Sequence, residues 1–307
     1  MKKNCNYFEY WETEFNTVLI LISTLIKEPS DKIRRYNQKI IKKTLQNVKP
    51  GLKTDMKNYL KLLRLGSLIY AEDFEKSVIY NKRAYLESKE YSVDYELSKI
   101  NYSCCLITLG EYEKAVKILE EPCSFDINLI NKDTYLSYEN NLLIARFMSN
   151  VLSPKQAYNQ LFKLLKSAYD FNSSDATILR NNLAAIMLIS NPEESINELI
   201  ELSKNQDLYH SFYAKHNLIY RYFIGNQIEE FEDLVNDISY DFLLKNYVDF
   251  FSYKFNTMRS MMNINLSHEA KNQNLMRILK GHSIYSNRQY SHYSQPILYG
   301  GLERWFE

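Results

Sequence analysis

The chain consists of amphipathic segments of roughly 10 to 16 residues, in which apolar side chains recur with the 3.6-residue period of an α-helix. Residues that break helices separate these segments, namely Gly110, Pro122, Pro154, Pro192 and Gly225. A segment of this kind cannot bury its apolar side alone, so neighbouring segments must pack against each other. The pattern therefore predicts an all-α protein.

Glycine is too scarce for most nucleotide-binding folds. Only 7 glycines and 6 prolines occur in 307 residues, and the sequence has no G-x-G-x-x-G and no G-x-x-x-x-G-K-[ST] motif. Hydrophobic residues make up 45% of the chain, which is enough for a continuous core. These features exclude a phosphate-binding glycine loop and a globally disordered chain.

One stretch carries a recognisable helix–turn–helix pattern. Leu109-Gly110-Glu111-Tyr112 is followed by Ala115, Val116 and Leu119, so that a helix ends near glycine and a small residue faces the crossing with the next helix. The same template fits other parts of the chain, with crossing positions in the first helix of each pair at Gly66, Ser103, Ala145, Ala184 and Ile219. These positions are 37, 42, 39 and 35 residues apart.

This pattern resembles the tetratricopeptide repeat, whose unit is about 34 residues long. The resemblance implies a right-handed α-solenoid of about five helical hairpins over residues 55–240, with helical caps at 1–54 and 241–307. The sequence departs from the family pattern at the tryptophan position of the first helix, which holds Lys99 or Arg180. A related solenoid of helical hairpins remains an alternative.

No catalytic, metal-binding or membrane-spanning motif emerges from the sequence. The five histidines are scattered, the four cysteines lack zinc-type spacing, and neither H-E-x-x-H nor G-x-S-x-G occurs. The apolar run 18–26 is too short for a bilayer, which needs about 20 residues. We therefore expect a reduced, cytoplasmic, non-enzymatic protein without a metal or cofactor.

Polar residues on the first helices suggest a peptide-binding groove. Asparagine followed by leucine recurs in these helices, and an amide can pair with a peptide backbone while a cation holds an acidic group. The candidate contact residues are Asn141, Arg146, Arg180, Asn181, Lys215 and Arg221. In the alternative interpretation, the asparagines bridge neighbouring helices and the cations remain solvated.

The two ends of the chain are basic or aromatic. Residues 27–57 contain 10 basic and 3 acidic residues, and a basic helical face is expected from Arg34, Arg35, Lys39, Lys42 and Lys43. That face is either solvated or contacts nucleic acid phosphates. At the other end, we expect Trp305 and Phe306 to dock on the aromatic segment 240–280, because such a pair is costly to expose.

The sequence thus predicts a protein–protein interaction module whose concave groove binds a protein segment or an acidic peptide. An alternative function is a ligand- or partner-sensing regulatory subunit of a bacterial signalling or anti-phage system, by analogy with other solenoids. RNA or DNA binding through the basic ends is a third hypothesis.

Overall fold

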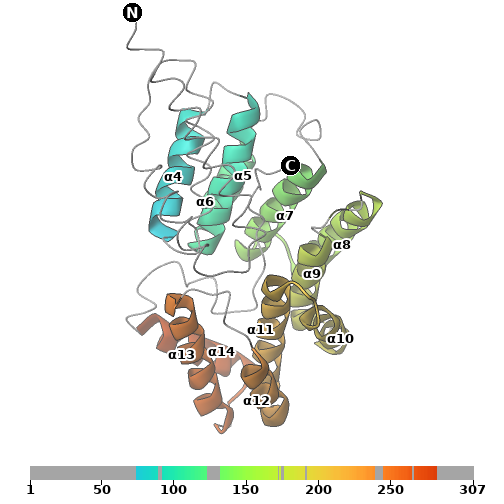
Figure 1. Cartoon of the computed structure of the whole chain (residues 1–307), viewed down its shortest axis with the longest axis vertical. Coiled ribbons are helices and arrows are strands. Elements are labelled where there is room, and N and C mark those ends of the chain that lie inside the picture. The colour runs from blue at the N-terminus through green and yellow to red at the C-terminus, as the bar shows by residue number, and fades with distance from the viewer. Residues whose placement is uncertain are drawn as a thin grey trace, which may run out of the picture. The chain divides into compact units, whose positions relative to one another are not determined.

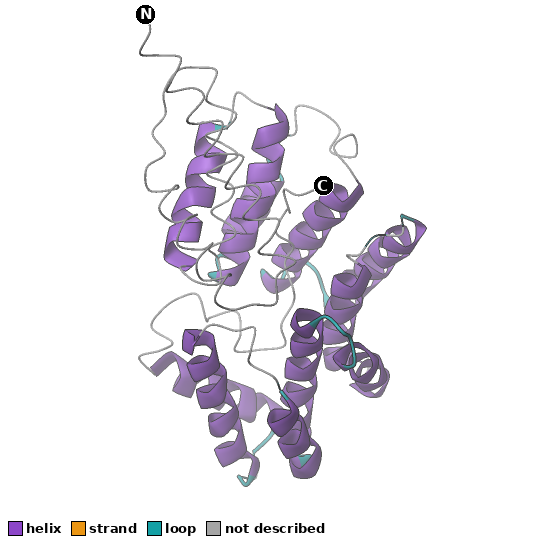
Figure 2. Cartoon of the chain, viewed as in Figure 1, coloured by secondary structure: helices purple, strands orange, loops and turns teal. Residues whose placement is uncertain are grey.

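The computed structural model describes residues 74–88, 92–122, 132–171, 173, 176–190, 192–238, 245–264 and 266–281. These ranges contain eleven helices and no strand, so the predicted all-α class is confirmed (Figures 1 and 2). The basic face with Arg34, Arg35, Lys39, Lys42 and Lys43 lies outside the described residues. So do the predicted boundaries at 54 and 240 and the pair Trp305 and Phe306.

The described residues divide into two compact units between Ser98 and Lys99, inside helix α5 (Ser92–Thr108). The first unit contains helix α4 (Phe74–Glu87) and the start of α5. Within it, the rings of Tyr85 and Tyr95 stack with their centroids 5.6 Å apart. Aromatic stacking therefore joins these two helices.

The second unit continues from α5 through nine further helices. They are α6 (Tyr112–Leu119), α7 (Lys132–Met148), α8 (Pro154–Asp170), α9 (Ala176–Ser190), α10 (Pro192–Ser203), α11 (Leu208–Gly225), α12 (Ile228–Asp237), α13 (Lys245–Met262) and α14 (His268–Gly281). Each helix from α6 to α12 packs on the next one along the chain, and α13 and α14 pack on α11 and on each other. This consecutive packing is what a helical repeat requires. We call α5, α7, α9 and α11 first helices, and α6, α8, α10 and α12 second helices.

Three turns from a first to a second helix use a residue in the left-handed backbone region. Gly110 has φ 74°, Asn150 has φ 61° and Asn226 has φ 55°. Glycine and asparagine tolerate this conformation best, and it closes the end of a helix. The sequence analysis placed the last of these breaks at Gly225, but Gly225 ends α11 and the left-handed residue is Asn226.

The start of α8 shows how the sequence sets a helix boundary. The Ser153 hydroxyl accepts a hydrogen bond from the Gln156 backbone NH, and the Gln156 side chain accepts one from the Ser153 backbone NH. Pro154 occupies the first helical position, where its missing NH costs nothing. Ser153 and Gln156 therefore form a reciprocal capping box at the start of α8.

Small residues lie buried where helices cross. The side chains of Ala115, Ala145, Ala157, Ala184 and Ser195 are all fully buried. The Ser195 hydroxyl donates to the Ala184 carbonyl oxygen at 2.7 Å, which links α10 to α9. The predicted placement of Ala115, Ala145 and Ala184 at crossings agrees with their burial, and Ser195 adds a hydrogen bond that alanine would lack.

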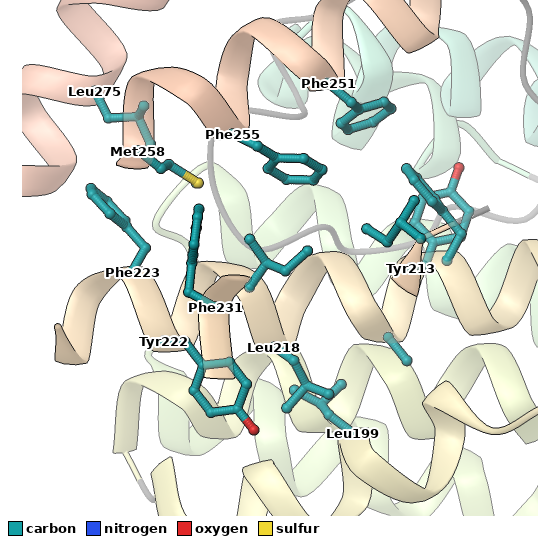
Figure 3. Packing of buried hydrophobic residues seen from close by; sticks show 14 of the residues in the cluster. Leu199, Tyr213, Leu218, Tyr222, Phe223, Phe231, Phe251, Phe255, Met258 and Leu275 are labelled. Carbon is teal, nitrogen blue, oxygen red and sulfur yellow. The ribbon is translucent and has the colours of Figure 1, made fainter. Parts of the chain in front are cut away.

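The aromatic segment after residue 240 belongs to the core of the second unit. Phe255 and Met258 on α13 face Phe231 on α12 and Phe223 on α11 (Figure 3). Phe251 packs further along α11, with its ring centroid 4.8 Å from that of Phe212. Lys271 on α14 is also buried, and its ammonium donates to the carbonyl oxygen of Phe223 at 3.3 Å and to Asn226 Oδ1. The lysine thus caps the end of α11, where the helix dipole favours a cation.

We predict that Ala115→Phe lowers the free energy of unfolding by roughly 1–3 kcal/mol or more, because a ring cannot enter a fully packed crossing without displacing its neighbours. Thermal or urea denaturation followed by circular dichroism measures the change. Lys114→Phe is the matched control, since Lys114 is exposed on the same helix. Equal stability of the two variants would show that the crossing is placed wrongly.

Candidate functional site

The six predicted groove residues lie on three first helices. Asn141 and Arg146 belong to α7, Arg180 and Asn181 to α9, and Lys215 and Arg221 to α11. The cations and the amides of this set have different surroundings in the structure.

The asparagines are interior residues. Asn141 is fully buried and donates to the Ile100 carbonyl oxygen of α5 at 3.4 Å. Asn182 donates to Asn140 Oδ1 at 2.8 Å, and Asn217 donates to Asn181 Oδ1 at 3.2 Å. We call these five residues the asparagine ladder, because their amides connect α5 to α7, α7 to α9, and α9 to α11.

The asparagine ladder gives Asn141 and Asn181 a structural role in place of the predicted contact with a peptide. Buried polar groups need hydrogen-bond partners, and these amides find theirs in neighbouring helices. Their side chains are therefore not presented to a peptide in this structure, and helix bridging, the alternative interpretation of the sequence, describes their contacts. The groove hypothesis depends on the four cations.

Three cations hold the end of the second helix that follows them in the chain. They lie four residues before the crossing positions Ser103, Ala184 and Ile219, and we call them the lock cations: Lys99, Arg180 and Lys215. Lys99 Nζ donates to the Glu121 carbonyl oxygen at 2.8 Å, and Lys215 Nζ lies 2.6 Å from Asp237 Oδ2. A cation at the C-terminal end of a helix also interacts favourably with the helix dipole.

Arg180 is the most strongly held of the lock cations. Its Nε lies 2.5 Å from Glu198 Oε1, and its terminal nitrogen lies 3.0 Å from Glu201 Oε1. The hydrogen bond to Glu198 raises the pKa of the Arg180 guanidinium further, against the opposing effect of burial. The unusual residues Lys99 and Arg180 at the expected tryptophan position thus join the two helices of a pair.

Arg146 and Arg221 have other contacts. The Nε and a terminal nitrogen of Arg146 both bond Glu120 Oε1, at 3.0 and 2.7 Å, at the end of α6. The Nε atom of Arg221 is buried and has no hydrogen-bond partner among the described residues. A Cβ atom at Gly225 would lie 2.4 Å from the Arg221 guanidinium, so the glycine leaves room for this side chain.

Lys254 and His216 form a buried basic pair that the sequence did not predict. Lys254 Nζ on α13 lies 2.5 Å from His216 Nε2 on α11, and both side chains are fully buried. The His216 ring also contacts the rings of Phe212, Phe251 and Phe255. Burial lowers the pKa of the Lys254 ammonium well below its ordinary value. No sequence motif marks this pair, whose members are 38 residues apart.

The described residues contain neither a cluster of metal-ligating side chains nor a membrane-spanning helix. No group of three or more His, Cys, Asp or Glu side chains in these ranges is arranged to hold a metal ion. None of the described helices is long and apolar enough to cross a membrane. The neighbouring thiols of Cys104 and Cys105 are both buried and unbridged.

Comparison with known proteins does not add a relative. The sequence matches no protein-family profile, no curated protein and no solved structure. The tetratricopeptide pattern is therefore a resemblance carried by the residues quoted above.

We predict that Asn182→Leu costs about 1–3 kcal/mol of stability, because it removes a donor from the buried Asn140 amide oxygen. The double variant Asn140→Leu/Asn182→Leu should cost less than the sum of the two single variants, and urea denaturation measures all three. Asn197→Leu on the exposed side of α10 is the control. Strict additivity would contradict a direct amide–amide bond.

The buried lysine predicts a pH dependence. The unfolded chain binds a proton at Lys254 that the folded protein binds poorly, so the free energy of unfolding should rise from pH 7 to about 8.5. Burial also lowers the pKa of Lys271, which therefore contributes to the same rise in stability. Above about pH 8.5 the buried Cys104 thiol acts in the opposite sense, because burial raises its pKa and the unfolded chain loses this proton first. Burial raises the pKa of Tyr220 to about 12, and the titration of this tyrosine affects the stability only at higher pH. Urea denaturation at several pH values measures this slope.

Lys254→Met should increase stability at pH 7 and flatten the slope, since it removes the group that must lose its proton on folding. Lys204→Met, at an exposed position, should change neither quantity. A Lys254→Met protein with an unchanged slope would assign the pH dependence to other groups.

Proposed function

We propose that the chain is a non-enzymatic interaction module whose helix pairs wind as a right-handed, tetratricopeptide-like solenoid and bind an acidic protein segment along the first helices. In this proposal the segment contacts Arg146 on α7, Arg180 on α9 and Lys215 on α11. The buried asparagines position these helices and do not touch the segment.

The observation that carries the proposal is a set of accessible ion pairs on three successive first helices. Arg146, Arg180 and Lys215 are each partly exposed, and each already holds a carboxylate. Two of these carboxylates, on Glu201 and Asp237, are well exposed to solvent, with 69% and 70% of the side chain accessible. The cations are therefore oriented for carboxylates before any partner arrives.

Exchange of these internal carboxylates for those of a partner is energetically cheap. An exposed ion pair, such as those that end on Glu120, Glu201 and Asp237, contributes about 0–1 kcal/mol, so breaking it costs little. The partly buried pair of Arg180 with Glu198 can remain in place while Glu201 is exchanged. Arginine presents a planar fork of donors that matches a carboxylate with two parallel hydrogen bonds. Three such positions on successive helices would favour an extended acidic segment over a single acidic side chain.

We predict that Arg146→Gln/Arg180→Gln weakens binding of the acidic segment at least tenfold while the melting temperature changes little. Affinity purification with the wild-type chain, followed by mass spectrometry, identifies the partner, and calorimetry with a synthetic peptide from its acidic segment measures the affinity. Glutamine is preferred to glutamate, because a glutamate at 180 would repel Glu198 and Glu201.

Arg259→Gln is the matched control for this experiment. Arg259 also pairs with a carboxylate of a second helix, Glu232 at 2.5 Å, but it lies on α13 and outside the proposed contact set. Unaltered affinity of the double variant, with a folded protein, would remove α7 and α9 from the binding site.

A further inference from the structure

The second helices share a row of outward-facing positions, spaced i, i+4 and i+8, that we call the outer row. Its members are Glu113, Lys117 and Glu121 in and just after α6, Lys155, Asn159 and Lys163 on α8, Glu193, Asn197 and Glu201 on α10, and Glu229, Asp233 and Asp237 on α12. All of them are exposed except Glu121, which is half-buried. Both ends of the row are acidic on α6, α10 and α12, and both are lysine on α8.

The change from acidic residues to lysines on α8 accompanies a change at the lock position of its partner helix, α7. The last acid of the outer row receives a lock cation from α9 at Glu201 and from α11 at Asp237. In α7 the lock position is occupied by the neutral and buried Asn141. A carboxylate at residue 163 would therefore have no cation to meet. The α7–α8 pair holds together without this lock, which leaves its outer row available for another role.

Aromatic side chains lie beside the lysines of α8. Phe162 and Tyr169 are 40% and 54% exposed, and the Phe162 ring stacks on Tyr158 with the centroids 6.0 Å apart. Lys166 Nζ lies over the Phe162 ring at 4.8 Å. We call Lys155, Tyr158, Phe162, Lys163, Lys166 and Tyr169 the α8 stripe. Lys155 and Lys163 form no ion pair with any described carboxylate.

The complementary surface is on the same chain. The outer row of α12 is acidic at all three positions, and Ile228 at its start is 46% exposed. Lys155 and Lys163 are eight residues apart, which is about 12 Å along a helix. Glu229 and Asp237 on α12 have the same spacing, with Asp233 between them. Asp237 also holds Lys215, but 70% of its side chain remains exposed. We propose that the α8 stripe of one copy docks on the outer row of α12 of a second copy of this chain.

A protein surface suits the α8 stripe better than a nucleic acid does. Exposed carboxylates cover the outward side of α10 and α12, in the same unit as α8, and would repel a polyanion that extended beyond α8. A second copy brings its carboxylates to the lysines and an apolar side chain to the aromatic rings. Because the two surfaces differ, the contact is heterologous and extends to further copies unless it closes into a ring.

Sedimentation velocity of the full chain tests the proposal. We expect a sedimentation coefficient that rises with protein concentration at roughly 0.05 M salt and falls to the monomer value at roughly 0.5 M salt, where surface charges are screened. A monomer at every concentration in low salt would overturn the proposal. The same experiment with a labelled thymidine oligonucleotide tests the competing ligand, and oligonucleotide binding at α8 without self-association would also overturn it.

Charge reversal in two variants makes the test specific. Lys155→Glu/Lys163→Glu leaves the rows of α8 and α12 both acidic. Glu229→Lys/Asp233→Lys makes two of the three positions on α12 basic and leaves the lysines of α8 in place. Each variant alone should therefore be monomeric. An equimolar mixture should associate again, because each row then meets its opposite. Asp237 is left unchanged, since it holds Lys215. A mixture that remains monomeric, with both variants folded by circular dichroism, would contradict a contact between these rows.

Lys114→Glu/Lys117→Glu on α6 is the matched control for the reversal of α8, since both residues are exposed and the change of net charge is the same. This variant should associate as the wild type does. Loss of association in the control would mean that net charge, and not the α8 stripe, governs the behaviour. These variants leave Arg146 and Arg180 unchanged, so failure here is separate from failure of the acidic-segment binding proposed above.

Discussion

Hydrogen bonds between buried amides hold the first helices in register, and the rest of the second unit depends on that register. An apolar helix interface tolerates sliding, since one aliphatic contact replaces another at little cost. A buried amide does not, because a shift leaves a donor or acceptor without a partner. The bonds from Asn182 to Asn140 and from Asn217 to Asn181 therefore fix α7, α9 and α11 relative to one another. The second helices pack on this frame.

The outward surface follows from this frame. The lock cations Arg180 and Lys215 direct the ends of α10 and α12, and carboxylates at residues 201 and 237 are part of those contacts. Where the lock is missing, at Asn141, the second helix carries lysines and aromatic rings. The residue at the lock position of a first helix thus correlates with the charge of the outer row on the second helix that follows it.

Much of the fold was predictable from the sequence, because short-range signals determine it. Ser153, Pro154 and Gln156 mark a helix start through contacts within four residues, and the small residue Ala115 marks a crossing. The environment of the asparagines was not predictable, since an amide on a first helix faces a groove or a neighbouring helix according to packing that sequence spacing does not contain. The pair of Lys254 and His216 depends entirely on contacts between distant helices. A lysine in an aromatic segment gives no local sign that it is buried.

The polar contacts that connect α5, α7, α9, α11 and α13 also differ in kind. An amide meets a backbone carbonyl between α5 and α7, amides meet amides between α7 and α9 and between α9 and α11, and an amine meets an imidazole between α11 and α13. The helix pairs are consequently not interchangeable parts, although they share one pattern. Exchanging the α5–α6 pair or the α11–α12 pair with another would bring together surfaces whose polar groups do not match. The buried interfaces therefore determine the order of the helix pairs. A gene rearrangement that changed this order would be disfavoured because the product would fold poorly.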